Sequence, residues 1–173
     1  MCGRFGMSME QARIEERFGA RFAAEFRPRY NAAPSQSLPV ILNTDLHTIH
    51  CISWGLHPIW MPAARKHKGI INVRVETLRE RPTFTRDFVA RRCLVLADSF
   101  YEWKKEGKVR RPFRITLTSG EPFAFAGIWQ ENTEKNGQRI KTFALITTAA
   151  NPLVAQVHDR MPVMLRKEAE QRC

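Results

Sequence analysis

The stretch Phe123–Trp129, with the sequence FAFAGIW, decides the fold. Its apolar and aromatic composition is typical of a buried β-strand. Asn136-Gly137 follows it, and this dipeptide favours the tight turn of a β-hairpin, so we predict a partner strand from Gln138 to Thr148. The sequence therefore predicts a sheet that is built from antiparallel hairpins.

The same pattern recurs on the N-terminal side of this hairpin. Val40–Leu42 and Leu46–Trp54 flank a turn-forming segment, Cys93–Asp98 reads as a central strand, and Pro112–Leu117 follows a basic turn. Short helices are predicted between and after these strands, over Met9–Phe22 with a Ser8/Gln11 capping box, Phe84–Phe88, Leu153–Val157 and Arg166–Gln171. We expect an α+β fold, a single domain over residues 1–173 with a curved, mainly antiparallel sheet.

The segment Ile70–Thr77 is predicted to be a half-buried strand. Apolar residues at 71, 73 and 75 alternate with Asn72, Arg74 and Glu76, and such alternation places the two sets on opposite faces. The polar row is either an ordinary solvated face or part of a site.

The charge of the chain points to nucleic acid as a partner. Lys and Arg number 28 against 17 Asp and Glu, which gives a net charge of +11, and the excess is spread along the sequence with aromatic residues between the cations. The alternative is a basic protein without a polyanionic ligand. At 173 residues, 43% of them hydrophobic, the chain is long enough to bury one core.

The cysteines and the lack of an apolar run exclude several classes of protein. No stretch reaches membrane-spanning length and the N-terminus lacks a signal-peptide pattern, so we expect the protein in the bacterial cytosol or nucleoid, away from membranes. We also expect it to be a monomer. Cys2, Cys51, Cys93 and Cys173 lie far apart, which argues against a zinc site or a disulfide framework. We expect reduced thiols, core positions for Cys51 and Cys93, no metal and no cofactor.

Cys2 follows the initiator methionine, and removal of Met1 would leave a free α-amine and a thiol on one residue. The reference pKa values of an α-amine and a thiol, about 8 and 8.5, give each group an appreciable nucleophilic fraction near neutral pH. An aldehyde is the natural partner, because the amine forms a Schiff base and the thiol then closes a thiazolidine ring. The alternative is an inert residue at a frayed terminus.

Six motifs in register span most of the chain, and together they resemble the SOS response-associated peptidase (SRAP) family of abasic-site processing proteins. The motifs are Met1-Cys2-Gly3-Arg4, Tyr30-Asn31-Ala32-Ala33-Pro34, Trp54-Gly55-Leu56 with Pro58, Asn72-Val73-Arg74-Val75-Glu76-Thr77, Phe100-Tyr101-Glu102-Trp103-Lys104 and His158-Asp159-Arg160-Met161-Pro162. Family members have a barrel-like antiparallel sheet, in agreement with the predicted hairpins.

The resemblance implies that processed Cys2 captures the aldehyde of an abasic site in single-stranded DNA as a covalent thiazolidine link, as part of the response to DNA damage. It further implies that Glu102 and His158 are the acid/base pair and that Asn72 positions residue 2. The chemistry also requires proton transfer near neutral pH, which a histidine and a partly buried glutamate can supply. A lyase activity on the abasic strand is a further expectation.

The DNA contacts that we expect are cationic and aromatic. The resemblance implies that Arg4 and Arg74 hold phosphates, and Arg160 is a third candidate. Trp60 or Trp103 could stack on unpaired bases. Pro34 and Trp60 are candidates for a wedge that keeps the DNA bent and unpaired.

Two alternative functions remain open on the sequence. The terminal cysteine could serve a hydrolase or peptidase, with His158 as base and Glu102 or Asn72 as orienting group. The basic, aromatic face could instead bind damaged DNA without covalent chemistry. The family usually continues for several tens of residues beyond Met161-Pro162, so we also expect this chain to be truncated at its C-terminus.

Overall fold

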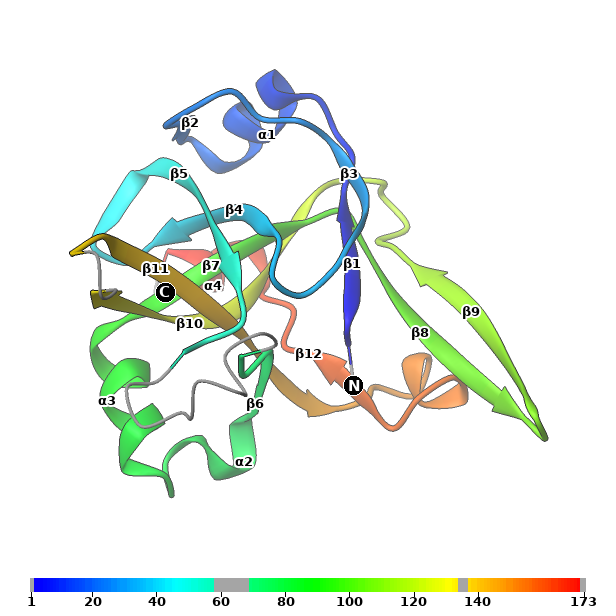
Figure 1. Ribbon diagram of the computed structural model, residues 1–173. Helices are drawn as coiled ribbons and strands as arrows, with labels where there is room; N and C mark the ends of the chain where they lie inside the picture. Colours follow the sequence, from blue (N-terminus) through cyan, green and yellow to red (C-terminus); the bar gives the residue numbers. More distant parts are fainter. Residues whose placement is uncertain (1, 58–68, 134–136, 172–173) are drawn as a thin grey trace.

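The computed structural model describes residues 2–57, 69–133 and 137–171 and contains a closed five-stranded β-barrel (Figure 1). Its strands are β4 (Ser37–Leu42), β5 (Asp45–Trp54), β7 (Arg92–Ala97), β10 (Phe123–Thr133) and β11 (Arg139–Ala149). Antiparallel pairs join β5 to β4, β4 to β7, β7 to β10 and β10 to β11, and β11 closes the ring by pairing with β5 in parallel. The predicted curved, mainly antiparallel sheet is therefore confirmed.

A second, four-stranded sheet carries the N-terminus. Its order is β3 (Arg29–Ala32), β1 (Arg4–Met7), β8 (Ser99–Glu106) and β9 (Val109–Ile115), all antiparallel. In Figure 1 the distal half of β8 and β9 extends away from the rest of the chain as a two-stranded arm.

Short elements extend and flank the barrel. The barrel sheet also includes β2 (Arg21–Phe22), β6 (Asn72–Arg74) and β12 (Arg160–Pro162). The helical elements in the described part of the chain are α1 (Gln11–Phe18), α2 (Val75–Leu78), α3 (Pro82–Ala90), η2 (Val154–Gln156, a 3-10 turn) and α4 (Lys167–Glu170). None of the helices described has the length and apolar character that crossing a membrane would require.

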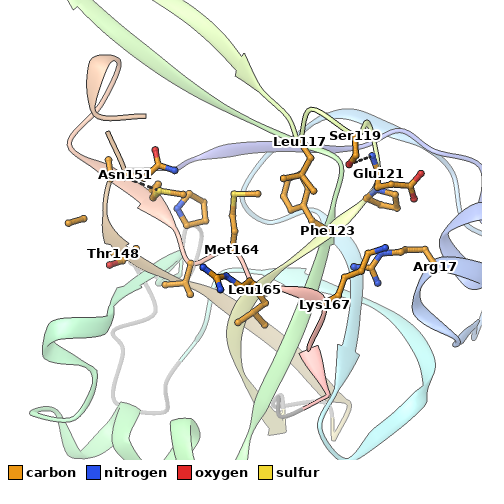
Figure 2. Close-up of a pocket in the computed structure, with 17 residues that line it drawn as sticks. Arg17, Leu117, Ser119, Glu121, Phe123, Thr148, Asn151, Met164, Leu165 and Lys167 are labelled. Carbon is orange, nitrogen blue, oxygen red and sulfur yellow. Dashed lines mark hydrogen bonds between the residues drawn. The ribbon is translucent and has the colours of Figure 1, made fainter. Parts of the chain in front are cut away.

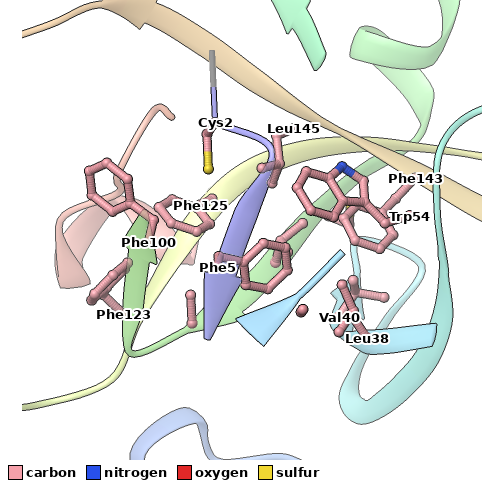
Figure 3. Close-up of a cluster of buried hydrophobic side chains, with 14 of the residues drawn as sticks. Cys2, Phe5, Leu38, Val40, Trp54, Phe100, Phe123, Phe125, Phe143 and Leu145 are labelled. Atoms are coloured by element: carbon pink, nitrogen blue, oxygen red, sulfur yellow. The ribbon is translucent and has the colours of Figure 1, made fainter. Parts of the chain in front are cut away.

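One apolar core joins the two sheets (Figure 3). Phe5 of β1 packs against Trp54 of β5 and Phe125 of β10, with ring centroids 5.0 and 5.9 Å apart. Phe100 of β8 also contacts Phe125, at 5.9 Å. Tilted and edge-on aromatic pairs of this kind add to the stabilisation that comes from burial, so the N-terminal strand is held firmly against the barrel.

The predicted helix over residues 9–22 is shorter in the structure, and its predicted capping box is wrong. The helix ends at Phe18 because Gly19 adopts the left-handed conformation, with φ at 63°, and Phe22 lies in β2. Ser8 does not cap the helix, because its backbone N–H and its hydroxyl both donate to Asp98.

Two further sequence predictions need correction. Only Asn72–Arg74 of the predicted strand 70–77 is extended; the chain turns into α2 at Val75, which is 41% exposed rather than buried. Cys51 is exposed rather than in the core, because its neighbour Ile52 faces the interior and successive residues of a strand point to opposite faces. Cys93 is buried, as predicted.

Candidate active site

Cys2 lies just before β1 and is completely buried at the edge of the aromatic core (Figure 3). Its thiol donates a long hydrogen bond of 3.5 Å to the carbonyl oxygen of Arg4. Residue 2 is therefore not part of a frayed terminus, and its reactivity stays a prediction.

Burial and, to a smaller extent, the negative charge of Glu102 together raise the pKa of the Cys2 thiol from 9.0 to about 12. This corrects the expectation that the thiol needs little help from the fold near neutral pH. In the chain that retains Met1 the thiol is neutral, so it can act as a nucleophile only when a neighbouring group accepts its proton.

Asn72 fixes the backbone of residue 2. Its side-chain Nδ2 donates to the carbonyl oxygen of Cys2 at 2.8 Å. The side chain is placed by β6, which pairs in parallel with β11 so that Asn72 stands opposite Leu145. The other amide atom, Oδ1, is buried and has no hydrogen-bond partner among the described residues. A buried acceptor of this kind is costly, so the site offers an acceptor for one further N–H donor.

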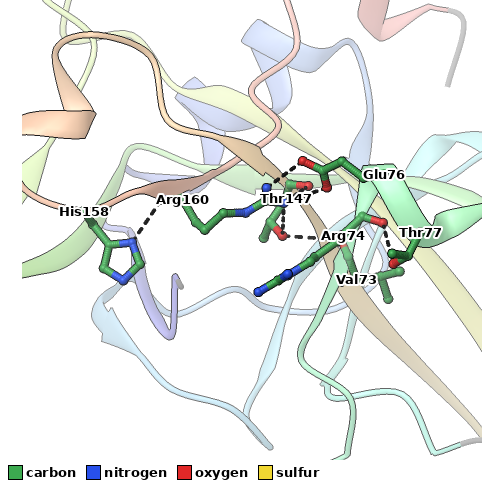
Figure 4. Close-up of polar contacts among 7 residues, drawn as sticks. All are labelled: Val73, Arg74, Glu76, Thr77, Thr147, His158 and Arg160. Carbon is green, nitrogen blue, oxygen red and sulfur yellow. Dashed lines mark hydrogen bonds and ion pairs between the residues drawn. The ribbon is translucent and has the colours of Figure 1, made fainter.

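Glu102 and His158 stand close together near Cys2. Glu102 on β8 is 2% exposed, and its Oε2 lies 4.0 Å from Nε2 of His158. The backbone N–H of Arg160 donates to Nδ1 of His158 at 3.0 Å, which leaves the proton of a neutral imidazole on Nε2, facing Glu102 (Figure 4). Asp159 Oδ1 lies 2.9 Å from the same Nδ1 and can accept from it when the ring carries two protons.

The structure thus brings together the four residues that the sequence analysis named as catalytic candidates. They come from four separate segments of the chain: Cys2 precedes β1, Asn72 lies in β6, Glu102 lies in β8, and His158 lies between η2 and β12. Together they present a buried thiol, an amide that holds the N-terminal backbone, a buried carboxylate and an imidazole. This set can exchange protons with a carbonyl compound near residue 2; the individual roles stay predictions.

The predicted DNA contacts lie at different depths around this set. Arg4 is half-buried, and its Nη1 donates to Asn31 Oδ1 at 3.4 Å. Arg74 and Trp103 are exposed, and Pro34 is half-buried in a turn. Trp60 lies outside the described residues, so its predicted role as a wedge or stacking platform stays a prediction.

Arg160 has a structural role that the sequence analysis missed (Figure 4). Its guanidinium makes two hydrogen bonds to Glu76, at 2.6 and 3.0 Å, and one to the carbonyl oxygen of Thr147 at 2.9 Å. The pKa of Glu76 falls to about 2, chiefly because of its hydrogen bonds to Arg160. The pair ties α2 to β11 and β12. A phosphate would have to share this guanidinium with Glu76.

Asp98 is a second residue that sequence analysis missed. It follows β7 directly, is 5% exposed, and accepts hydrogen bonds from the backbone and hydroxyl of Ser8 and from the hydroxyl of Ser99. It therefore fastens the far end of β1, the strand that Cys2 precedes. The sequence signal was an acidic residue at the end of an apolar run, but acidic residues usually lie on the surface, so this position did not stand out.

A separate cavity of about 790 Å³ lies between the start of β10, the end of β11 and the segment leading to α4 (Figure 2). Its lining includes Arg17, Phe123, Met164 and Lys167 and none of the four catalytic candidates. In the part of the chain that the structure describes, no group of three or more His, Cys, Asp or Glu side chains is placed to hold a metal ion.

Comparison with known proteins gives consistent matches over the whole chain. The family model described as "SOS response associated peptidase (SRAP)" matches residues 1–172. The abasic site processing protein YoqW of Bacillus subtilis is 41% identical, over 98% of this chain and 78% of the relative. The abasic site processing protein YedK of Escherichia coli is 32% identical over 98% of this chain and 77% of its own length.

More distant relatives and solved structures agree with these matches. The abasic site processing protein HMCES of Gallus gallus is 28% identical over 95% of this chain and 62% of its own length. A crystal structure of a protein from Bacteroides thetaiotaomicron superposes with a TM-score of 0.90 at 25% identity, over 99% of this chain and 80% of that one. A protein from Bordetella bronchiseptica gives 0.87 at 25% identity, over 99% and 87%.

Proposed function

The chain belongs to the SOS response-associated peptidase family, and we propose that it processes abasic sites in DNA, capturing them in single strands through a covalent bond to Cys2. The names of its relatives support the first part. The observation that carries the second is the burial of Cys2 beside Glu102, with Asn72 holding the backbone of the same residue.

The first step is the removal of Met1, which frees the α-amine of Cys2. Asn72 already donates to the carbonyl oxygen of Cys2, and in this proposal its buried, unpartnered Oδ1 accepts from the new N–H groups. This contact would orient the amine and compensate the unpaired oxygen. Asn72 is thus a positioning residue in the proposed reaction.

The amine then attacks C1′ of the ring-opened abasic sugar, which is an aldehyde. The nitrogen–carbon bond forms as the nitrogen gives up one proton and the carbonyl oxygen gains one. The resulting carbinolamine, once its hydroxyl is protonated, loses water to give a protonated Schiff base. Loss of water needs a proton donor at the departing hydroxyl. Glu102 and His158, 4.0 Å apart, can pass this proton between a carboxyl and an imidazole group.

The thiol of Cys2 closes the ring in the second bond-forming step. Its sulfur adds to the Schiff-base carbon, its proton is taken up by the neighbouring base, and the nitrogen ends as a secondary amine in a five-membered thiazolidine. Overall, aldehyde and aminothiol combine with the release of one water. Because the folded environment keeps the thiol neutral, a base is required at this step, and Glu102 is the carboxylate whose charge acts on this thiol.

The experiment that tests the proposal compares one precursor before and after processing. A tagged chain carries its tag directly on Cys2, and a protease releases Cys2 as the N-terminus. Each form is incubated with single-stranded DNA that contains one abasic site, and denaturing electrophoresis and intact mass report the adduct. We expect a stable adduct, equal in mass to both components less one water, only after cleavage.

The outcomes of this experiment and of a Cys2→Ser variant separate the competing functions. If the tagged form links to DNA as fast as the cleaved form, the α-amine is not a reactant and the thiazolidine proposal is wrong. Cys2→Ser keeps the amine and lacks the thiol, so we expect a complex that survives denaturation only after borohydride reduction. Peptide turnover without any adduct would favour a hydrolase, and a salt-sensitive complex without an adduct would favour a binding module.

A further inference from the structure

The distal part of the β8–β9 hairpin projects beyond the other strands of both sheets, which do not cover it (Figure 1). On its other side β8 pairs with β1, but only from Ser99 to Tyr101, so residues 102–113 form a two-stranded arm in the described structure. Val109–Arg114 are all exposed. An apolar ribbon with this exposure would be a site of aggregation, and this one is strongly basic instead.

The pairing register divides the side chains of the arm between two faces. Directly opposite residues share a face, so Trp103 with Pro112 and Lys105 with Arg110 lie on one face, which we call the platform face. Lys104 with Arg111 and Glu106 with Val109 lie on the other. Both faces therefore carry cations, but in different surroundings.

On the second face the cations are compensated. Glu106 lies 3.9 Å from Lys104 and 3.5 Å from Arg111, so one carboxylate serves both. On the platform face Lys105 and Arg110 form no ion pair with any described residue, and neither does Lys108 in the turn. The uncompensated charge of the arm is thus concentrated on the platform face and at its tip.

The platform face extends inward to β1, the strand that Cys2 precedes, whereas Glu102 lies on the opposite face of β8. Arg4 is opposite Tyr101 across β1 and β8, and Tyr101 is opposite Arg114 across β8 and β9. Three rows follow one another outward, first Arg4–Tyr101–Arg114, then Trp103–Pro112, then Lys105–Arg110. At about 3.4 Å per residue they cover roughly 14 Å, the length of about four stacked nucleotides at 3.4 Å each.

We propose that the platform face of the arm binds the single strand that flanks the captured abasic site. This inference rests on the proposed function for the position of the lesion. Trp103 and Pro112 give a flat surface on which unpaired bases stack, and Lys105, Arg110 and Lys108 face the phosphates beyond. The stacking surface favours a single strand, because the bases of a duplex have their faces covered.

Two double variants on the same hairpin test the proposal. Lys105→Gln/Arg110→Gln removes two cations from the platform face, and Lys104→Gln/Arg111→Gln removes two from the opposite face, so net charge falls equally. Binding of each to an intact 20-nucleotide single strand is measured by fluorescence anisotropy across a salt series. We expect the platform variant to reduce the log–log salt slope by roughly 1.4, at about 0.7 for each phosphate, and the other variant to leave it unchanged.

The difference in salt slope between the parent and the platform variant can also be expressed as a ratio of affinity losses. Between 50 and 200 mM salt the parental affinity should fall about sevenfold more than that of the platform variant. Equal losses in both variants would mean that net charge alone attracts DNA, and the arm proposal would be wrong. A larger effect on duplex than on single strand would also overturn it.

The length of the strand separates this proposal from the covalent one. An abasic site with two nucleotides on each side does not reach the tip of the arm, so both variants should cross-link it at the parental rate under saturating protein. A platform variant that links this short strand more slowly contradicts the proposal. If no form of the protein links DNA, the covalent proposal fails while the salt series still decides the role of the arm.

Discussion

Glu102 and Trp103 are neighbours on β8, yet they belong to two different regions of the molecule. Glu102 is 2% exposed and acts on the buried Cys2, whereas Trp103 is 36% exposed and begins the platform face of the arm. In the first region desolvation raises the pKa of the Cys2 thiol. In the second, charge and stacking determine affinity. β8 therefore carries both regions, one on each face, and substitutions should separate their contributions to cross-linking rate and to DNA affinity.

The largest expected effect is on the buried side of this comparison. Glu102→Gln keeps the size of the side chain and removes the proton acceptor, and general acid–base groups contribute about 10²–10⁴-fold to a rate. We expect single-turnover cross-linking to slow by a factor in that range while affinity for intact single strands stays within twofold. His158→Ala should behave similarly.

Parental rates in both variants would show that these residues are not the acid/base pair. A matched loss of affinity and rate would instead show that the two regions are not separable. Circular dichroism and thermal unfolding serve as the control for folding, since Glu102 is buried.

The next effect is on the exposed side. Trp103→Ala removes the stacking surface, so we expect a loss of roughly 1–3 kcal/mol in binding single strands and little change in cross-linking rate at saturating protein. Phe113→Ala is the matched control, because Phe113 is also 36% exposed but stands opposite Glu102, on the other face. Equal losses in the two variants would contradict the assignment of the platform to one face.

The smallest expected effect is on the stability of the fold and concerns the ion pair of Glu76 and Arg160, which belongs to neither of the two regions. Because the pKa of Glu76 is lowered from 4.5 to about 2, the ion pair stabilises the fold fully above pH 4.5 and less as the pH falls toward 2. Glu76 is half-exposed, so solvent screening keeps the contribution small.

Chemical unfolding of the parent and of Glu76→Gln across this range checks the sign. The difference in unfolding free energy should be constant above pH 5 and should shrink between pH 4.5 and 2. A difference that grows on acidification would contradict the lowered pKa. Cross-linking near neutral pH should be unaffected.

The sequence predicted the hairpins because their signals are local. Asn136-Gly137 and the alternating strands around it specify a turn and its neighbours without reference to the rest of the chain. The parallel contact of β5 and β11 that closes the barrel joins residues about ninety positions apart, and no local pattern specifies it. Family resemblance supplied the barrel where periodicity could not.

The members of the candidate site were predictable, but their physical state was not. Asn72 was named from its motif, while its contact with Cys2 depends on the parallel pairing of β6 with β11. The high pKa of the Cys2 thiol depends on burial by residues from distant strands, so the reference value was wrong. The exposure of Cys51 shows the same limit, because an apolar run does not reveal which residues face inward.

The complete burial of Cys2 sets an order of events during synthesis. An aminopeptidase needs an extended N-terminus, so we expect Met1 to be removed before β1 docks between β3 and β8. The second of these partners, beginning at Ser99, is not synthesised until the chain is about 100 residues long, which takes roughly 5–20 s at 5–20 residues per second. Chains that fold before the enzyme reaches them bury Cys2 with Met1 still attached, and under the proposed mechanism such chains would remain inactive for as long as they stay folded.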